Sequence, residues 1–149
     1  MADIEELARL TIDCGLQVHR SLGPGLLESV YEAVLASSLA KRGLKVDRQV
    51  PIAIQVEDLA FAEGFRADVL VEDRLLVEVK SVDRLLPVHG KQLLTYLRLT
   101  HQPLGVLLNF GGATFREGIR RIVNNHTELG SSRLRVNQAA LIQAIPSEE

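Results

Sequence analysis

Apolar residues recur every three or four positions in two stretches near the start of the chain, which predicts two amphipathic helices. The first covers Ile4 to Arg20, and the second runs from about Leu26 to Arg42. Gly23-Pro24-Gly25 separates them, because glycine is common just past a helix end and proline is tolerated in a first turn. The predicted apolar side of the second helix consists of Leu27, Val30, Tyr31, Val34, Leu35 and Leu39.

From Val46 onward the pattern changes to alternation, which is typical of half-buried strands. Pro51 lies in the first strand and indicates a sheet edge or a bulge, because proline cannot donate a ladder hydrogen bond. Turns are expected at Glu57-Asp58 and just after Val71. The three expected strands cover about Val50 to Val56, Phe65 to Glu72, and Leu75 to Ser81.

Helical spacing returns from about Val88 to Thr100, and the apolar run Leu104 to Phe110 predicts a buried strand. Residues 114–123 fit either a further strand or a short helix, and a last helix is expected over 138–145. The fold class is α/β (α+β), with the core order helix, three-stranded meander, helix, strand. We expect residues 1–124 to form the domain, with 125–149 as a C-terminal tail or extra helix of the same single domain.

Composition narrows the class of protein. The chain has 149 residues, of which 46% are hydrophobic and 24% charged, so intrinsic disorder is excluded. No stretch is long and apolar enough to predict a membrane span, and the acidic N-terminus does not resemble a secretory signal. The single cysteine, Cys14, excludes an internal disulfide and indicates a reducing, cytoplasmic setting. With a net charge of −2, nucleic-acid binding would require a local basic patch.

Charged residues interrupt the otherwise apolar third strand. Glu78 and Lys80 share one face of this strand, because side chains alternate. A three-residue turn before this strand would place Asp68 directly opposite Glu78, whereas a two-residue turn would send the two carboxylates to opposite faces. Opposed like charges repel, and a hard divalent cation with oxygen ligands would stabilise such a pair. The alternative is an exposed strand face with a weak cross-strand ion pair.

Polar residues on the two flanking helices could join these groups. Glu28 and Tyr31 lie on one helix face, and so do Gln92 and Tyr96, with His89 three positions before Gln92. Each also has an ordinary structural interpretation. A glutamate in a first turn is favoured by the helix dipole, and Gln92 and Tyr96 could form a polar helix edge.

In order along the chain, Glu28, Asp68, Glu78-Val79-Lys80 and Gln92-x-x-x-Tyr96 resemble the PD-(D/E)XK nuclease superfamily, including the Gln-x-x-x-Tyr element of its RecB-like branch. Gly25 to Tyr31 also resembles the signature of the bacterial GxxExxY proteins. The resemblance extends from about His19 to Asn124, and Ala67 replaces the proline of the superfamily's name. It implies a restriction-endonuclease-like core with a mixed central sheet flanked by helices.

The resemblance also implies a hydrolase that cleaves phosphodiester bonds with Mg²⁺ or Mn²⁺. Asp68, Glu78 and the backbone carbonyl of Val79 would hold the metal, and Glu28 would complete the shell directly or through water. Lys80 would orient or deprotonate the attacking water. Gln92 and Tyr96 would position the substrate phosphate or the Lys80 amine. The remaining expected substrate contacts are Tyr31, His89, Lys91 and Arg98.

The substrate class expected from this resemblance is nucleic acid, with DNA favoured. The alternative is a non-catalytic nuclease-like module that binds nucleic acid or a partner protein, an interpretation favoured by the mildly acidic charge and the few aromatic residues. A homodimer and a protein partner both stay open. Further phosphate contacts could come from a basic cluster of Arg116, Arg120 and Arg121, which could equally be ordinary solvated surface.

Overall fold

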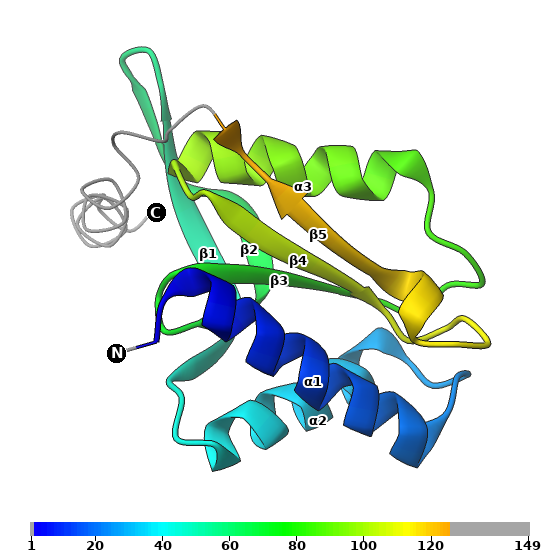
Figure 1. Ribbon diagram of the computed structural model, residues 1–149. Coiled ribbons are helices and arrows are strands. Elements are labelled where there is room, and N and C mark those ends of the chain that lie inside the picture. The colour runs from blue at the N-terminus through cyan, green and yellow to red at the C-terminus, as the bar shows by residue number, and fades with distance from the viewer. Residues whose placement is uncertain (1, 126–149) are drawn as a thin grey trace.

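In the computed structural model, which describes residues 2–125, a five-stranded sheet carries α1 and α2 on one face and α3 on the other (Figure 1). The predicted mixed sheet flanked by helices is thereby confirmed. The elements are α1 (Ile4–Leu22), α2 (Glu28–Lys41), β1 (Val46–Val56), β2 (Leu59–Val71), β3 (Leu75–Lys80), α3 (Pro87–Thr100), β4 (Leu104–Asn109), the 3-10 helix η1 (Arg116–Gly118) and β5 (Ile119–Val123).

The strands follow one another in the sheet in sequence order, β1-β2-β3-β4-β5. β3 and β4 are parallel, and every other neighbouring pair is antiparallel. A parallel pair needs a crossover connection, and α3 provides it by crossing one face of the sheet. β1 is an edge strand, so the position of Pro51 agrees with the expectation from sequence.

Two hydrophobic cores lie on the two faces of the sheet. Val77 and Val79 of β3 belong to the core beneath α1 and α2, whereas Leu76 belongs to the core beneath α3. Because side chains alternate along a strand, Glu78 and Lys80 fall on the same face as Leu76. The charged positions of β3 therefore face the side of the sheet that α3 covers.

α2 differs from its prediction in two respects. It begins at Glu28 rather than Leu26, and three residues assigned to its apolar side are exposed: Leu27, Val30 and Val34. Glu32 takes their place among the buried residues, with 4% of its surface exposed. Helical periodicity identifies apolar positions, but only packing against the sheet decides which side of the helix is buried.

The structure also defines two segments whose bounds or type the sequence left uncertain. β2 begins at Leu59, six positions before the predicted start, so β1 and β2 form a long hairpin. Residues 114–123 contain both the 3-10 helix η1 and the strand β5. The helix predicted over 138–145 and the tail 125–149 lie outside the described residues, apart from residue 125. None of the helices within 2–125 has the length and apolarity needed to span a membrane.

A buried asparagine joins the end of β4 to the segment that follows β3. The Asn109 side chain accepts a hydrogen bond from the Val82 N–H at 2.9 Å and donates to the Val82 carbonyl at 2.8 Å. The side-chain amide thus continues the β3–β4 pairing beyond the last paired residues. Gly111 is packed against the same segment, and a Cβ atom there would lie 2.4 Å from the Val82 carbonyl oxygen.

Gly111→Ala should therefore destabilise the fold, because the backbone of residue 82 would have to move to admit the new methyl group. Overpacking of this kind costs about 1–3 kcal/mol, measurable by urea unfolding. Gly112→Ala is the matched control, since the nearest atom to its new Cβ would lie at an ordinary 3.5 Å. Equal losses of stability in the two variants would contradict the close approach at Gly111.

Candidate active site

The turn between β2 and β3 determines which side chains meet across the hairpin. Val71 pairs with Leu75 and Val69 pairs with Val77, so the turn has three residues and the register places Asp68 opposite Glu78. Of the two turns that the sequence left open, the structure contains the longer one. The regular ladder ends at Val69, and the Asp68 carboxylate accepts the next hydrogen bond, from the Val79 N–H at 2.8 Å.

Glu78 is a buried carboxyl group whose charge lacks full compensation. Only 9% of its surface is exposed, and its Oε1 atom has no hydrogen-bond partner among the described residues. Burial raises the pKa of Glu78 to about 9, with a further contribution from the neighbouring Asp68 charge, while Lys80 acts in the opposite direction. In the absence of a cation, Glu78 is thus a protonated acid at neutral pH.

α3 adds a tyrosine to the same site. The ring of Tyr96 stacks on Phe65 of β2, with ring centroids 3.8 Å apart and planes within 2° of parallel. Its hydroxyl accepts a hydrogen bond of 2.7 Å from Gln92. Burial raises the pKa of Tyr96, and the charges of Glu78 and Asp68 raise it further. The Tyr96 hydroxyl therefore lies within electrostatic reach of both carboxylates, as the interpretation of Gln92-x-x-x-Tyr96 as a site element requires.

The loop before α2 is tied both to the core and to the end of β3. Tyr31 is fully buried against Phe110, and its hydroxyl donates to the Gly23 carbonyl and accepts from the Leu26 N–H. Ser81, just after β3, donates a 2.6 Å hydrogen bond to the Leu26 carbonyl. Tyr31 thus fixes the loop that leads into Glu28, the exposed first residue of α2. Substrate contact by Tyr31 stays a prediction.

The donor atoms at this position fit a divalent cation. Within residues 2–125 no group of three or more His, Cys, Asp or Glu side chains is arranged to hold a metal. The structure brings together the carboxylates of Asp68 and Glu78, and Glu28 does not join them in such a group. Mg²⁺ binds proteins through one or two carboxylates and keeps several waters, so the pair provides enough ligands. A cation would also satisfy the unpaired Glu78 Oε1.

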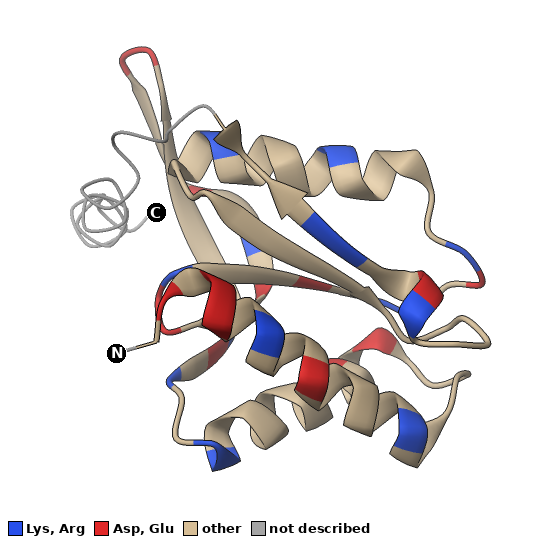
Figure 2. Ribbon diagram, in the orientation of Figure 1, with Lys and Arg blue, Asp and Glu red and all other residues tan. Residues whose placement is uncertain are grey.

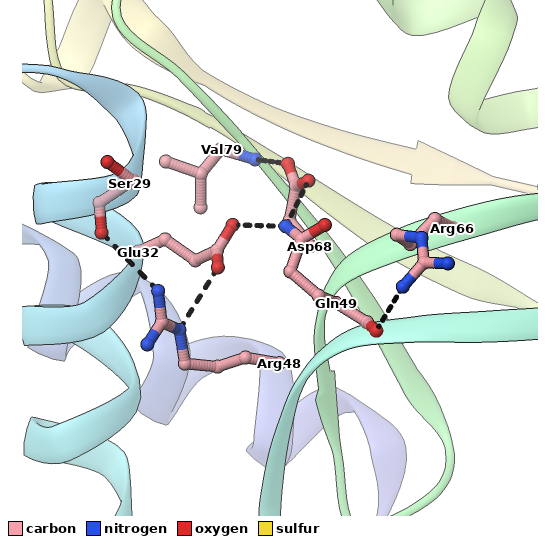
Figure 3. A network of polar contacts seen from close by, with 7 residues as sticks. All are labelled: Ser29, Glu32, Arg48, Gln49, Arg66, Asp68 and Val79. Atoms are coloured by element: carbon pink, nitrogen blue, oxygen red, sulfur yellow. Dashed lines mark hydrogen bonds and ion pairs between the residues drawn. The ribbon is translucent and has the colours of Figure 1, made fainter.

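Sequence reasoning missed a polar network that reaches Asp68 from the other side (Figure 3). Buried Glu32 of α2 forms an ion pair with Arg48 at 3.0 Å and accepts a 2.8 Å hydrogen bond from Gln49. Gln49 also donates to Asp68. One signal was available, since Glu32 precedes the buried Leu35 and Leu39 by three and seven positions. A glutamate on a buried helix face needs a partner.

The basic residues expected to contact phosphate lie mainly on α3 and in or near β5 (Figure 2). α3 packs against β5. Lys91 and Arg98 are exposed on α3. The cluster expected after β4 does not act as a unit, because Arg121 pairs with Glu5 of α1, and Arg120 donates to carbonyls of residues 117 and 119.

His89 has a structural role at the start of α3. Its Nδ1 atom accepts a 3.0 Å hydrogen bond from the Leu86 N–H, which closes the first turn of the helix. The ring is half-buried, and the described structure shows no contact between it and the carboxylates. Substrate contact by His89, Lys91 and Arg98 stays a prediction.

Two carboxylates face each other across a β-hairpin, a lysine follows the second carboxylate by two residues on the same strand, and a crossover helix lies over that face. These features are those of a nuclease-like domain. The family model of the PD-(D/E)XK nuclease superfamily matches residues 5–122. The chain therefore belongs to that superfamily, whose nucleases usually use divalent metals.

Two further comparisons add little to this assignment. Among curated proteins, no match to the chain was found. Among solved structures, the crystal structure of SSO0001 is similar with a TM-score of 0.41 and 16% identity, over 95% of this chain and 88% of that one. A similarity this distant supports no conclusion about function.

The raised pKa of Glu78 predicts an unusual pH dependence in the metal-free protein. The unfolded chain loses this proton near pH 4.5, whereas the folded protein keeps it until about pH 9. The stability that the group contributes is therefore fully present below pH 4.5 and is lost as the pH rises to about 9. The free energy of unfolding should fall by up to about 1.4 kcal/mol per pH unit from this group alone.

Urea unfolding in EDTA, at about pH 5.5 and about pH 8, measures this slope. Glu78→Gln should flatten it, because the amide does not titrate. Glu117→Gln, at an exposed glutamate of η1, should leave it unchanged. Equal slopes in the wild type and Glu78→Gln would show that burial does not govern the titration of Glu78.

Proposed function

We propose that this protein is a divalent-metal-dependent nuclease that hydrolyses phosphodiester bonds in nucleic acid, with DNA as the favoured substrate. The observation that carries the proposal is the pair Asp68 and Glu78, opposed in one hairpin, with a buried and unpartnered oxygen on Glu78. A fold has little reason to place a buried carboxylate opposite a second carboxylate unless a cation joins them. Within the superfamily, the Gly25 to Tyr31 signature and the Gln92-x-x-x-Tyr96 element favour the GxxExxY proteins and the RecB-like branch.

In this proposal Asp68, Glu78 and the carbonyl of Val79 hold Mg²⁺ or Mn²⁺, and exposed Glu28 contributes through water. Bound there, the cation would lower the pKa of a coordinated water and neutralise charge on the phosphate. The protein's own task is to hold the carboxylates in place. Asp68 is fixed by the Val79 N–H, and Tyr31 together with Ser81 fixes the loop that precedes Glu28.

Lys80 is the residue suited to handle the proton of the attacking water. It follows Glu78 on the same strand face, and its charge is near enough to lower the pKa of Glu78. An ammonium group in this position orients water and offsets phosphate charge, and a desolvated lysine can also act as a base. Gln92 and Tyr96, which are hydrogen-bonded to each other, would position the phosphate or the Lys80 amine.

Cleavage of labelled single- and double-stranded DNA and RNA, with and without Mg²⁺ or Mn²⁺, tests the proposal. The wild type should cleave at least one substrate only with metal, and Asp68→Asn or Lys80→Ala should lower the rate by about 100-fold or more. Asp58→Asn, at the exposed tip of the β1–β2 hairpin, is the matched control and should cleave normally.

Metal binding is measured separately from cleavage. Mn²⁺ at a hundredfold excess over its Kd should raise the free energy of unfolding by about 2.7 kcal/mol. Glu78→Gln should lose this stabilisation. Metal binding without cleavage of any substrate would favour the non-catalytic module, and an equal stabilisation of wild type and Glu78→Gln would place the metal elsewhere.

Binding of the substrate phosphates should depend on the positively charged side chains of α3. Each neutralised phosphate contributes about −0.9 to the slope of log affinity against log salt for B-DNA. Lys91→Ala should therefore flatten this slope by about one unit without loss of metal binding. Lys41→Ala, at the exposed end of α2, is the control and should leave the slope unchanged. DNA affinity that does not vary with salt would exclude phosphate recognition.

A further inference from the structure

Gln49 occupies a strained position in β1, directly opposite Asp68. Arg48 pairs with Val69 and Val50 with Ala67, so the ladder omits Gln49. The backbone of Gln49 has φ of 52°, in the left-handed region that non-glycine residues seldom adopt. Strain of this kind persists when the surrounding structure enforces it, and it concentrates at functional sites.

In this backbone conformation, the Gln49 side chain contacts two carboxylates. Its Nε2 group donates to Glu32 Oε1 at 2.8 Å and to Asp68 Oδ1 at 3.4 Å (Figure 3). Ionised carboxylates only accept hydrogen bonds, so the NH₂ end of the amide must face both of them. A glutamate at this position would instead place three carboxylates together.

Glu32 provides the fixed end of this connection. It is 4% exposed, and its second oxygen accepts from Arg48 at 3.0 Å. The Arg48 charge compensates the buried carboxylate, so Glu32 can hold the amide of Gln49 without an unpaired charge. The shorter contact, to Glu32, anchors Gln49, and the longer contact acts on Asp68.

We propose that Gln49, anchored by Glu32, is a positioning residue that sets the orientation of the Asp68 carboxylate. Asp68 then has one oxygen directed to Gln49 and the other to the Val79 N–H, which fixes the plane of the carboxylate. Each oxygen keeps one lone pair for a cation. The benefit for metal binding rests on the proposed function, whereas the orientation of Asp68 does not.

Gln49→Met tests the positioning role, because methionine has a similar length and cannot donate a hydrogen bond. The first readout needs neither metal nor activity. Amide hydrogen exchange of Val79 in the metal-free protein reports how well Asp68 accepts its N–H, and we expect about threefold faster exchange. Gln55→Met is the matched control, since Gln55 lies on the same strand and is exposed, and within residues 2–125 its side chain donates to the Glu57 carbonyl alone.

The second readout is the Mn²⁺ dissociation constant, measured from the electron paramagnetic resonance signal of free Mn²⁺. Loss of a group that orients a metal ligand typically weakens binding about 10–100-fold, and the long contact to Asp68 favours the lower end, about tenfold. Gln49→Gly gives the same readouts in a backbone that accepts φ of 52° without strain. It separates loss of positioning from loss of folding, and its melting temperature should equal or exceed that of Gln49→Met.

The inference is supported if both Gln49 variants show faster amide exchange at Val79 and weaker Mn²⁺ binding, and if Gln55→Met shows neither change. The inference is overturned if the Gln49 variants exchange the Val79 amide at the wild-type rate. It is also overturned if they bind Mn²⁺ as tightly as the wild type while Asp68→Asn weakens Mn²⁺ binding. If the wild type binds no Mn²⁺, the proposed function fails, and the Val79 exchange rate alone still decides whether Gln49 orients Asp68.

Discussion

The opposition of two carboxylates across one hairpin is the constraint on which the rest of the site depends. Asp68 and Glu78 repel each other, and the burial of Glu78 adds to the cost of its charge. The surrounding structure limits that cost at several points. The Val79 N–H and Gln49 bind Asp68, Lys80 offsets part of the charge, and protonation removes it from Glu78 when no cation is present.

The fold supplies this constraint with rigid support from both faces of the sheet. β3 is held between β2 and β4, so its charged positions have little freedom to move away from Asp68. α3 crosses one face and brings Tyr96 to the carboxylates, while α2 on the other side provides Glu32. The site therefore combines a local hairpin with elements that reach it only through the complete three-layer arrangement (Figure 1).

Much of this arrangement could be predicted from the sequence, for reasons that differ between residues. Alternation along β3 placed Glu78 and Lys80 on one face, and helical spacing paired Gln92 with Tyr96. The turn length could not be chosen from the sequence, so the position of Asp68 stayed open until the structure supplied the register. Gln49 gave no signal, because its left-handed backbone and omitted ladder position arise from tertiary packing. The exposed side of α2 was misassigned for a similar reason.

The sequence separations within the site have a consequence for how the protein folds. Asp68 and Glu78 are ten positions apart in one hairpin, so their repulsion acts as soon as the hairpin closes. Ser81 and Leu26, by contrast, are separated by 55 positions, so closing their contact costs more conformational entropy. The repulsion between the carboxylates is therefore met in a local step, whereas the contact that ties the loop before α2 to the end of β3 is a long-range one.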